Sequence, residues 1–232
     1  MHFDRLAYPL MRVIVGKVSE AMKLGGISGL FFLLALVACV PNGVSENSSR
    51  VSRGPTTKIT ISGNDLIIQG PAGFCVDKKA SQIGEYSAVL LLGNCAIVSP
   101  SFRKQEPKIK ALLTATISSP EGNIGTVADS VQSMDKFFRS ENGRTALSRS
   151  SDPGTVEVLD TFHKDGIFYL RARDTSAGIV PGAAPDYWRA YFDLRGQLVS
   201  VSVIGFVNSP LEPEVALRTL QEFAFILRGK NS

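Results

Sequence analysis

The side chains with the most distinctive chemistry in this chain are three cysteines and two histidines. Cys39 stands at the end of an apolar run, whereas Cys75 and Cys95 lie within strand-like segments. His163 stands beside the turn-forming residues 164–166. The chemistry that each of these residues can perform depends on the segment that holds it in place.

Hydrolysis and metal binding both need more than these residues offer. A Ser–His–Asp arrangement requires a histidine held between a carboxylate and an activated serine, and the sequence has no G-x-S-x-G elbow. A metal site requires several ligands at matched spacing, which His163 with scattered carboxylates does not provide. We therefore predict no catalytic, metal-binding or cofactor-binding residue and expect no cofactor. Whether the chain is an enzyme is left open, with a non-enzymatic role favoured.

An export signal precedes the rest of the chain. Residues 24–38 are 15 uncharged, mostly apolar residues that follow Lys23 and end in small side chains, as in a secretory signal peptide. The run is shorter than the roughly 20 apolar residues that span a bilayer. We therefore expect residues 1–38 to be a signal peptide. Residues 1–21 make an unusually long leader, and a start at Met22 would give a compact signal, so the sequence favours Met22 as the true start.

The end of this run, LVAC at residues 36–39, resembles the lipobox of bacterial lipoproteins. The resemblance implies that the Cys39 thiol takes a diacylglycerol and that its acyl chains anchor the protein in a lipid bilayer. An ordinary signal cleaved near Ala38 is the alternative. Val40 stands where lipoproteins kept in the inner membrane usually carry Asp. The resemblance thus implies the periplasmic face of the outer membrane, with the inner membrane as the less favoured site.

Removal of the signal changes the charge and the cysteine content. It takes away four basic and two acidic residues and leaves a net charge of +2 without a basic stripe, which argues against nucleic-acid binding. With Cys39 acylated, Cys75 and Cys95 remain, and an oxidising compartment allows them one pairing. A reactive thiol is the alternative, but Cys95 lies in apolar surroundings. We predict a Cys75–Cys95 disulfide.

The rest of the chain divides into a tether and one domain. Residues 39–57 are rich in Ser and Asn and predict a lipidated flexible tether. Residues 58–232 predict a single globular domain. Hairpins are indicated by turn residues inside alternating patterns at 58–68, 155–173 and 188–206. Further strands are indicated at 74–77, 88–98 (with a bulge at Gly93) and 111–117.

Two helices complete the expected fold. Apolar residues at helical spacing predict helices over 126–138 and 212–228, the second ended by Gly229. Residues 140–154 read as a loop with room for a short helical turn. The expected fold is α+β, an antiparallel β-sheet with two main helices packed on one face and a wetter face opposite.

Three blocks carry a second resemblance: GPAGFCVD at 70–77, VLLLGNC at 89–95 and WRAYFDLRGQLVSVSVIGF at 188–206. Together they resemble a group of exported proteobacterial proteins to which no activity attaches, so the resemblance implies no functional residue. The last hairpin followed by a helix is also similar to the PsbP/Mog1-like fold. That likeness concerns the fold alone and does not fix a function.

Two segments are candidate contact surfaces. Residues 174–186 are long and apolar for a hairpin connection, and they are the first place to look for a binding site. The basic segment 102–110 could touch anionic lipid, although a solvated loop is the commoner role. We expect a lipid-anchored, non-enzymatic protein that binds another envelope component, protein or lipid. The alternatives are a small-ligand carrier with an apolar cavity between sheet and helices, and an envelope enzyme whose active site is not visible in the sequence.

Overall fold

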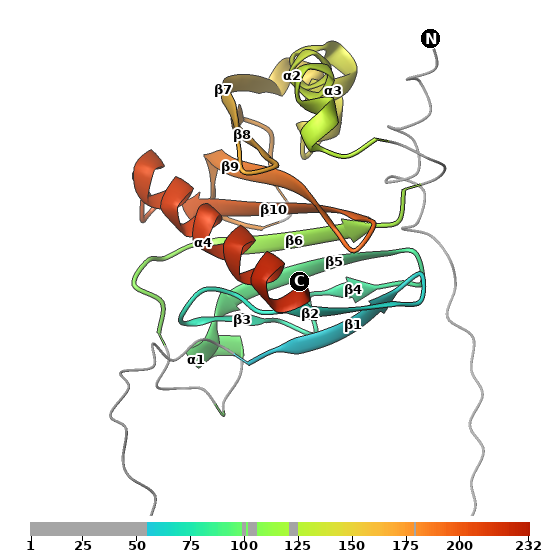
Figure 1. Cartoon of the computed structure of the whole chain (residues 1–232). Coiled ribbons are helices and arrows are strands. Elements are labelled where there is room, and N and C mark those ends of the chain that lie inside the picture. Colours follow the sequence, from blue (N-terminus) through green and yellow to red (C-terminus); the bar gives the residue numbers. More distant parts are fainter. Residues whose placement is uncertain (1–54, 99–100, 102–105, 121–124, 179) are drawn as a thin grey trace, which may run out of the picture. The chain divides into compact units, whose positions relative to one another are not determined.

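The computed structural model describes residues 55–98, 101, 106–120, 125–178 and 180–232. Within these ranges eight strands form one sheet (Figure 1): β3 (Phe74–Val76), β4 (Gln82–Ile83), β5 (Ser87–Asn94), β6 (Leu112–Ser118), β7 (Val156–Lys164), β8 (Ile167–Asp174), β9 (Ala183–Leu194) and β10 (Gln197–Phe206). Their order is β3-β5-β6-β10-β9-β8-β7, with β4 also paired to β5, and every pair is antiparallel. The predicted signal and Cys39 lie outside the described residues.

The remaining elements are a separate hairpin and the helices. The hairpin consists of β1 (Thr57–Ile61) and β2 (Asn64–Ile68). The α-helices of the described ranges are α1 (Cys95–Val98), α2 (Val131–Arg139), α3 (Glu141–Leu147) and α4 (Pro213–Asn231). None of them is long and apolar enough to cross a membrane. The predicted α+β class with an antiparallel sheet is confirmed.

The three predicted hairpins are present, and the backbone conformation of their turn residues accounts for them. The β7–β8 turn places Asp165 at φ 54° and Gly166 at φ 73°, and the β9–β10 turn places Arg195 and Gly196 at 51° and 74°. Two successive positive φ values twist a two-residue turn in the sense that antiparallel strands require, and Gly reaches them without steric cost. The strands begin and end within a few residues of the predicted bounds, except that β9 already begins at Ala183.

One face of the sheet is covered by α4 and the β1–β2 hairpin. Alternate residues of β9, among them Trp188, Ala190 and Phe192, face the helix side chains Leu220 and Phe223, and all are buried. Apolar residues of β5, β6 and β10 extend the same core, and the hairpin adds its own apolar side chains to it. This face is therefore the principal core, as the alternating pattern predicted at 188–206 requires.

The opposite face is covered in part by α2 and α3, which corrects the prediction that both helices pack on one face. Tyr187 and Tyr191 lie between the core residues of β9 and are buried here, not on a wetter face. The Phe138 ring of α2 stacks on Tyr191 at 5.0 Å between centroids and on Phe168 at 5.9 Å. The sequence pattern failed because aromatic tyrosines can be buried through their rings while the pattern counts them as polar.

Three local predictions need correction. The strand predicted over 88–98 ends at Asn94 without a bulge at Gly93, because Asn94 accepts a hydrogen bond from the Ala96 amide and opens α1. The predicted loop after residue 139 contains the helix α3. Helix α4 passes through Gly229 to Asn231, whose side chain binds both backbone groups of Ile67 and so holds the helix end against β2.

Candidate functional site

A groove with a volume of about 440 Å³ lies on the α4 face of the sheet, where the sheet extends past the start of the helix. It is lined by Arg171 and Arg173 of β8, residues 184–188 of β9, Val203 and residues 205–207 of β10, and Pro210, Leu211, Pro213 and Ala216 at the beginning of α4. We name it the α4 groove. Its volume lies in the range of small-molecule sites.

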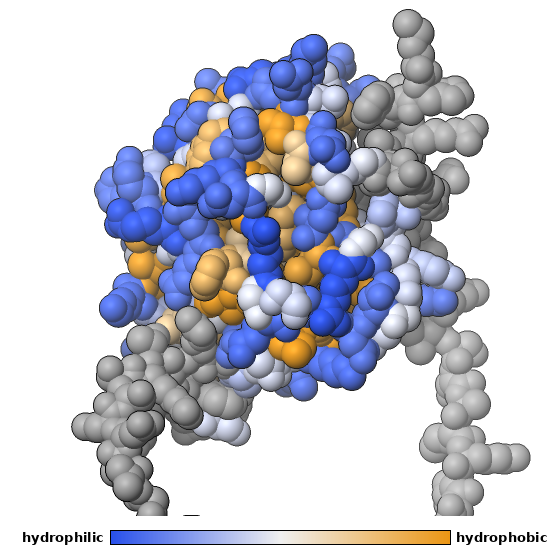
Figure 2. All heavy atoms as spheres, viewed as in Figure 1, coloured by the Kyte–Doolittle hydropathy of each residue, from blue (hydrophilic) through white to orange (hydrophobic). Residues whose placement is uncertain are grey.

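The wall of the α4 groove is mostly apolar. Trp188 is 5% exposed and lies edge-on to the Phe162 ring at 5.9 Å, so its position is fixed by the core. Val207 is 58% exposed at the rim. Seen from the α4 side, areas of apolar surface are interrupted by hydrophilic side chains (Figure 2). An apolar pocket with a few polar groups at its edge is the common form of a ligand site.

A glycine brings the loop before α4 close to the sheet. A Cβ atom on Gly205 would lie 3.1 Å from the Leu211 Cβ and 3.9 Å from the Ala184 Cβ. The missing side chain therefore lets Leu211 pack directly on β10 and form one side of the groove. A larger residue at this position would push the loop outward and change the shape of the groove.

Three charged side chains border the apolar wall. Arg173 holds Asp186 through two hydrogen bonds, Nε to Oδ1 at 2.7 Å and Nη2 to Oδ2 at 3.2 Å. Arg171 donates from Nη2 to the same Oδ2 at 3.3 Å. The hydrogen bond from Arg173 keeps the pKa of Asp186 below its usual value, so the carboxyl is ionised at neutral pH. Two guanidinium groups and one carboxylate leave the edge of the groove with one net positive charge.

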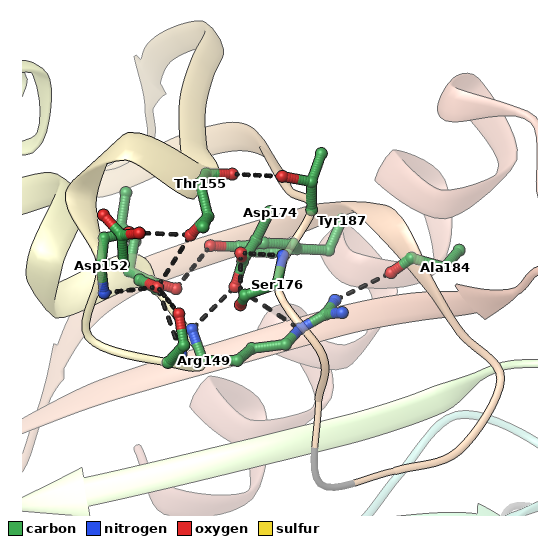
Figure 3. A network of polar contacts seen from close by, with 11 residues as sticks. Arg149, Asp152, Thr155, Asp174, Ser176, Ala184 and Tyr187 are labelled. Carbon is green, nitrogen blue, oxygen red and sulfur yellow. Dashed lines mark hydrogen bonds and ion pairs between the residues drawn. The ribbon is translucent and has the colours of Figure 1, made fainter.

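A polar network behind β9 fixes the wall residue Ala184 (Figure 3). The Arg149 Nη2 group donates to the Ala184 carbonyl at 2.8 Å. Asp174 is fully buried and accepts hydrogen bonds from the Arg149 amide at 2.7 Å and from the Ser176 amide at 2.9 Å. Burial raises the pKa of Asp174, but these hydrogen bonds outweigh it and lower the pKa overall. The network joins the loop before β7 to both ends of the segment that sequence analysis singled out.

One donor at the groove has no partner. The Trp188 indole Nε1 is buried and has no hydrogen-bond acceptor among the described residues. Buried donors in proteins nearly always have an acceptor, from protein or from water, because an unpaired one is costly. Trp188 also borders the α4 groove.

The residues singled out in the sequence have different outcomes. Cys75 and Cys95 form the predicted disulfide and are 1% and 0% exposed. His163 lies exposed on β7, where it pairs with Phe168, and its imidazole makes no hydrogen bond within the described part of the chain. No cluster of three potential metal ligands exists among the described residues. Of the basic segment 102–110, residues 102–105 lie outside the description, and Lys108 and Lys110 are exposed.

The predicted contact segment 174–186 contributes to the groove only through its last residues, because β9 begins at Ala183. Asp186 is the last residue of that segment, whereas sequence reasoning missed Arg171 and Arg173. A signal was present, since two arginines at positions i and i+2 of a strand must share one face of the sheet. The pattern alone does not show which face of the sheet this is or what covers it, because both depend on α4.

Neither protein-family models nor curated proteins match this sequence.

Proposed function

We propose that this protein is an exported lipoprotein, held at the periplasmic face of the outer membrane by acylated Cys39, and that its domain binds a small lipid-like envelope molecule in the α4 groove without reacting with it. The observation that carries the binding role is the groove itself: an apolar wall of core residues beside a charged edge. Its volume suits a small molecule more than the flat contact of two proteins.

Two features support export. The buried Cys75–Cys95 bond is of the kind that persists in oxidising compartments. The uncharged run before Cys39 fits a cleaved signal.

A non-reactive role fits the groove because its charged groups are one carboxylate and the two arginines that hold it. A general base or nucleophile needs a different environment.

Anchoring is tested on protein extracted from envelopes. The expected N-terminal peptide begins at Cys39 and carries acyl chains, and Cys39→Ser is expected to abolish acylation and anchoring. A mature protein without acyl groups that keeps residues 1–38 would refute this part of the proposal. A precursor peptide spanning Arg5 to Arg12 would refute Met22 as the start.

Binding is tested on a domain that has folded in the exported chain. A protease site placed in the tether releases the domain from membranes, so the assay needs no detergent. The neutral fluorophore 1-N-phenylnaphthylamine is expected to brighten on binding the wild type. Ala184→Phe fills the groove and is expected to remove this signal, whereas Val89→Phe enlarges an exposed residue elsewhere, 41% exposed, and is expected to retain it. Equal binding by the two variants, or none by the wild type, would refute the groove as the binding site.

A further inference from the structure

The charged edge of the α4 groove has more donor capacity than its internal contacts use. Arg171 makes a single hydrogen bond, at 3.3 Å, to a carboxylate that Arg173 already holds at 2.7 Å and 3.2 Å. A guanidinium group carries five N–H donors in a planar fork suited to an oxyanion. Arg171 therefore has four donors left for a bound molecule, whereas Arg173 uses two of its five to hold Asp186 and is the more firmly positioned of the two.

The neighbour of Arg171 across the sheet is the residue with the unpaired donor. In the β8–β9 register Arg171 stands directly opposite Trp188, so their side chains lie on the same face and next to each other. The Trp188 Nε1 group lacks an acceptor among the described residues. Trp188 thus places an apolar side chain beside the Arg171 guanidinium, while its own N–H group is buried and does not face the groove.

We propose that the molecule bound in the α4 groove is an amphipathic anion, whose acidic head is held by Arg171 at the positively charged edge and whose apolar body lies against Val203, Phe206 and Leu211. This inference rests on the proposed function, because it names the ligand class of the same groove. Asp186 has a defined part in it: its carboxylate occupies one donor of Arg171 and lowers the positive potential at the edge.

The test uses the released domain and its single tryptophan, Trp188, which reports on the groove through its own fluorescence. Three probes separate head from tail: octanoate, octan-1-ol with the same alkyl chain, and acetate with the same head. Octanoate is expected to bind at least tenfold more tightly than octan-1-ol, the ratio that one charge-assisted hydrogen bond of about 1.5 kcal/mol gives. It is also expected to bind at least tenfold more tightly than acetate, which lacks the apolar chain.

Two variants then move the affinity in opposite directions. Arg171→Met keeps an unbranched apolar stem and removes the guanidinium charge, and is expected to weaken octanoate binding about tenfold while leaving octan-1-ol unchanged. Asp186→Asn removes the competing carboxylate and is expected to strengthen octanoate binding. Arg218→Ala, an exposed arginine on the outer side of α4, is the matched control and is expected to change neither.

The outcomes separate this inference from the proposed function. Equal binding of octanoate and octan-1-ol, or weaker octanoate binding by Asp186→Asn, would overturn the acidic head while leaving an apolar ligand in the groove. Equal binding of acetate and octanoate would overturn the apolar body. Failure of octanoate, octan-1-ol and 1-N-phenylnaphthylamine alike to bind would overturn both the inference and the groove as a binding site.

Discussion

Reduction of the Cys75–Cys95 bond is expected to destabilise the domain by an amount set by the loop that it closes. The two cysteines are 20 residues apart in sequence. The chain-entropy relation for a loop of this length gives about 3.3 kcal/mol at 25 °C. For a domain of this size such a loss corresponds to a fall in Tm of about 10 °C. The bond joins β3, an edge strand of three residues, to α1 beside β5, where three β3–β5 residue pairs and the buried Phe74 also hold the strand.

The measurement compares urea unfolding of the oxidised protein with that of the same protein reduced and kept in reductant. Reduction changes no side-chain volume, so it avoids the cavity that a Cys→Ala substitution would add. Both cysteines are buried, and hence the reductant acts only after local opening. Amide exchange at Cys95, which donates to the Gly73 carbonyl at 2.8 Å, is expected to rise more than exchange at Val201 in the centre of the sheet.

Two results would refute this reasoning. A loss below about 1 kcal/mol on reduction would mean that the unfolded chain already confines the loop, contrary to the entropy argument. Free thiols at both positions in protein isolated from envelopes would mean that the bond does not form where the protein resides. The second result would also remove a support for export.

Three further substitutions test the layers of the fold by urea unfolding. Asp174→Asn is expected to cost about 2 kcal/mol at pH 7. Because the folded state lowers the pKa of Asp174 from its ordinary value of 3.8, its stabilisation exists above that value and the gap to wild type is expected to narrow as the pH falls below it. Phe138→Ala is expected to cost about 3 kcal/mol and to speed amide exchange in α2 and α3 more than in α4. Asn231→Ala removes three hydrogen bonds and is expected to cost about 2 kcal/mol, against less than about 0.5 kcal/mol for the exposed neighbour in Ser232→Ala.

Hairpins could be predicted because their signals are local. The pair Asp165–Gly166 and the alternating residues on either side of it specify both the turn and the register within a few residues of sequence. The same holds for the turn at Arg195–Gly196. Nothing distant in the chain is needed to form these units, and the structure shows them close to the predicted bounds.

The helix α3 could not be predicted because its support comes from its neighbours. It has no apolar stripe, and Gly143 within it would ordinarily argue against a helix. The structure gives that glycine a purpose: a Cβ atom there would fall 1.9 Å from the Phe137 carbonyl oxygen, so only Gly lets α3 turn back closely on α2. Ser140 accepts a hydrogen bond from the Gly143 amide and caps the new helix.

The groove could not be predicted from the sequence for a related reason. It forms where α4 no longer covers its face of the sheet. Along β8 the α4 face carries Ile167 and Tyr169 in the core, and then Arg171 and Arg173 at the groove. A strand places all four on one side, but only the position of α4 decides which of them are covered.

The place where α4 begins therefore creates the groove, and Pro213 determines where the helix begins. Pro213 is the first residue of the helix, where its missing N–H is not needed. If the helix began a turn earlier, Pro213 would lie in its interior, lose a backbone hydrogen bond and clash with the preceding turn, at about 3 kcal/mol. Because α4 begins only at Pro213, the helix does not cover Arg171. The part of the sheet face beyond the helix is left open, and this is where a ligand could bind.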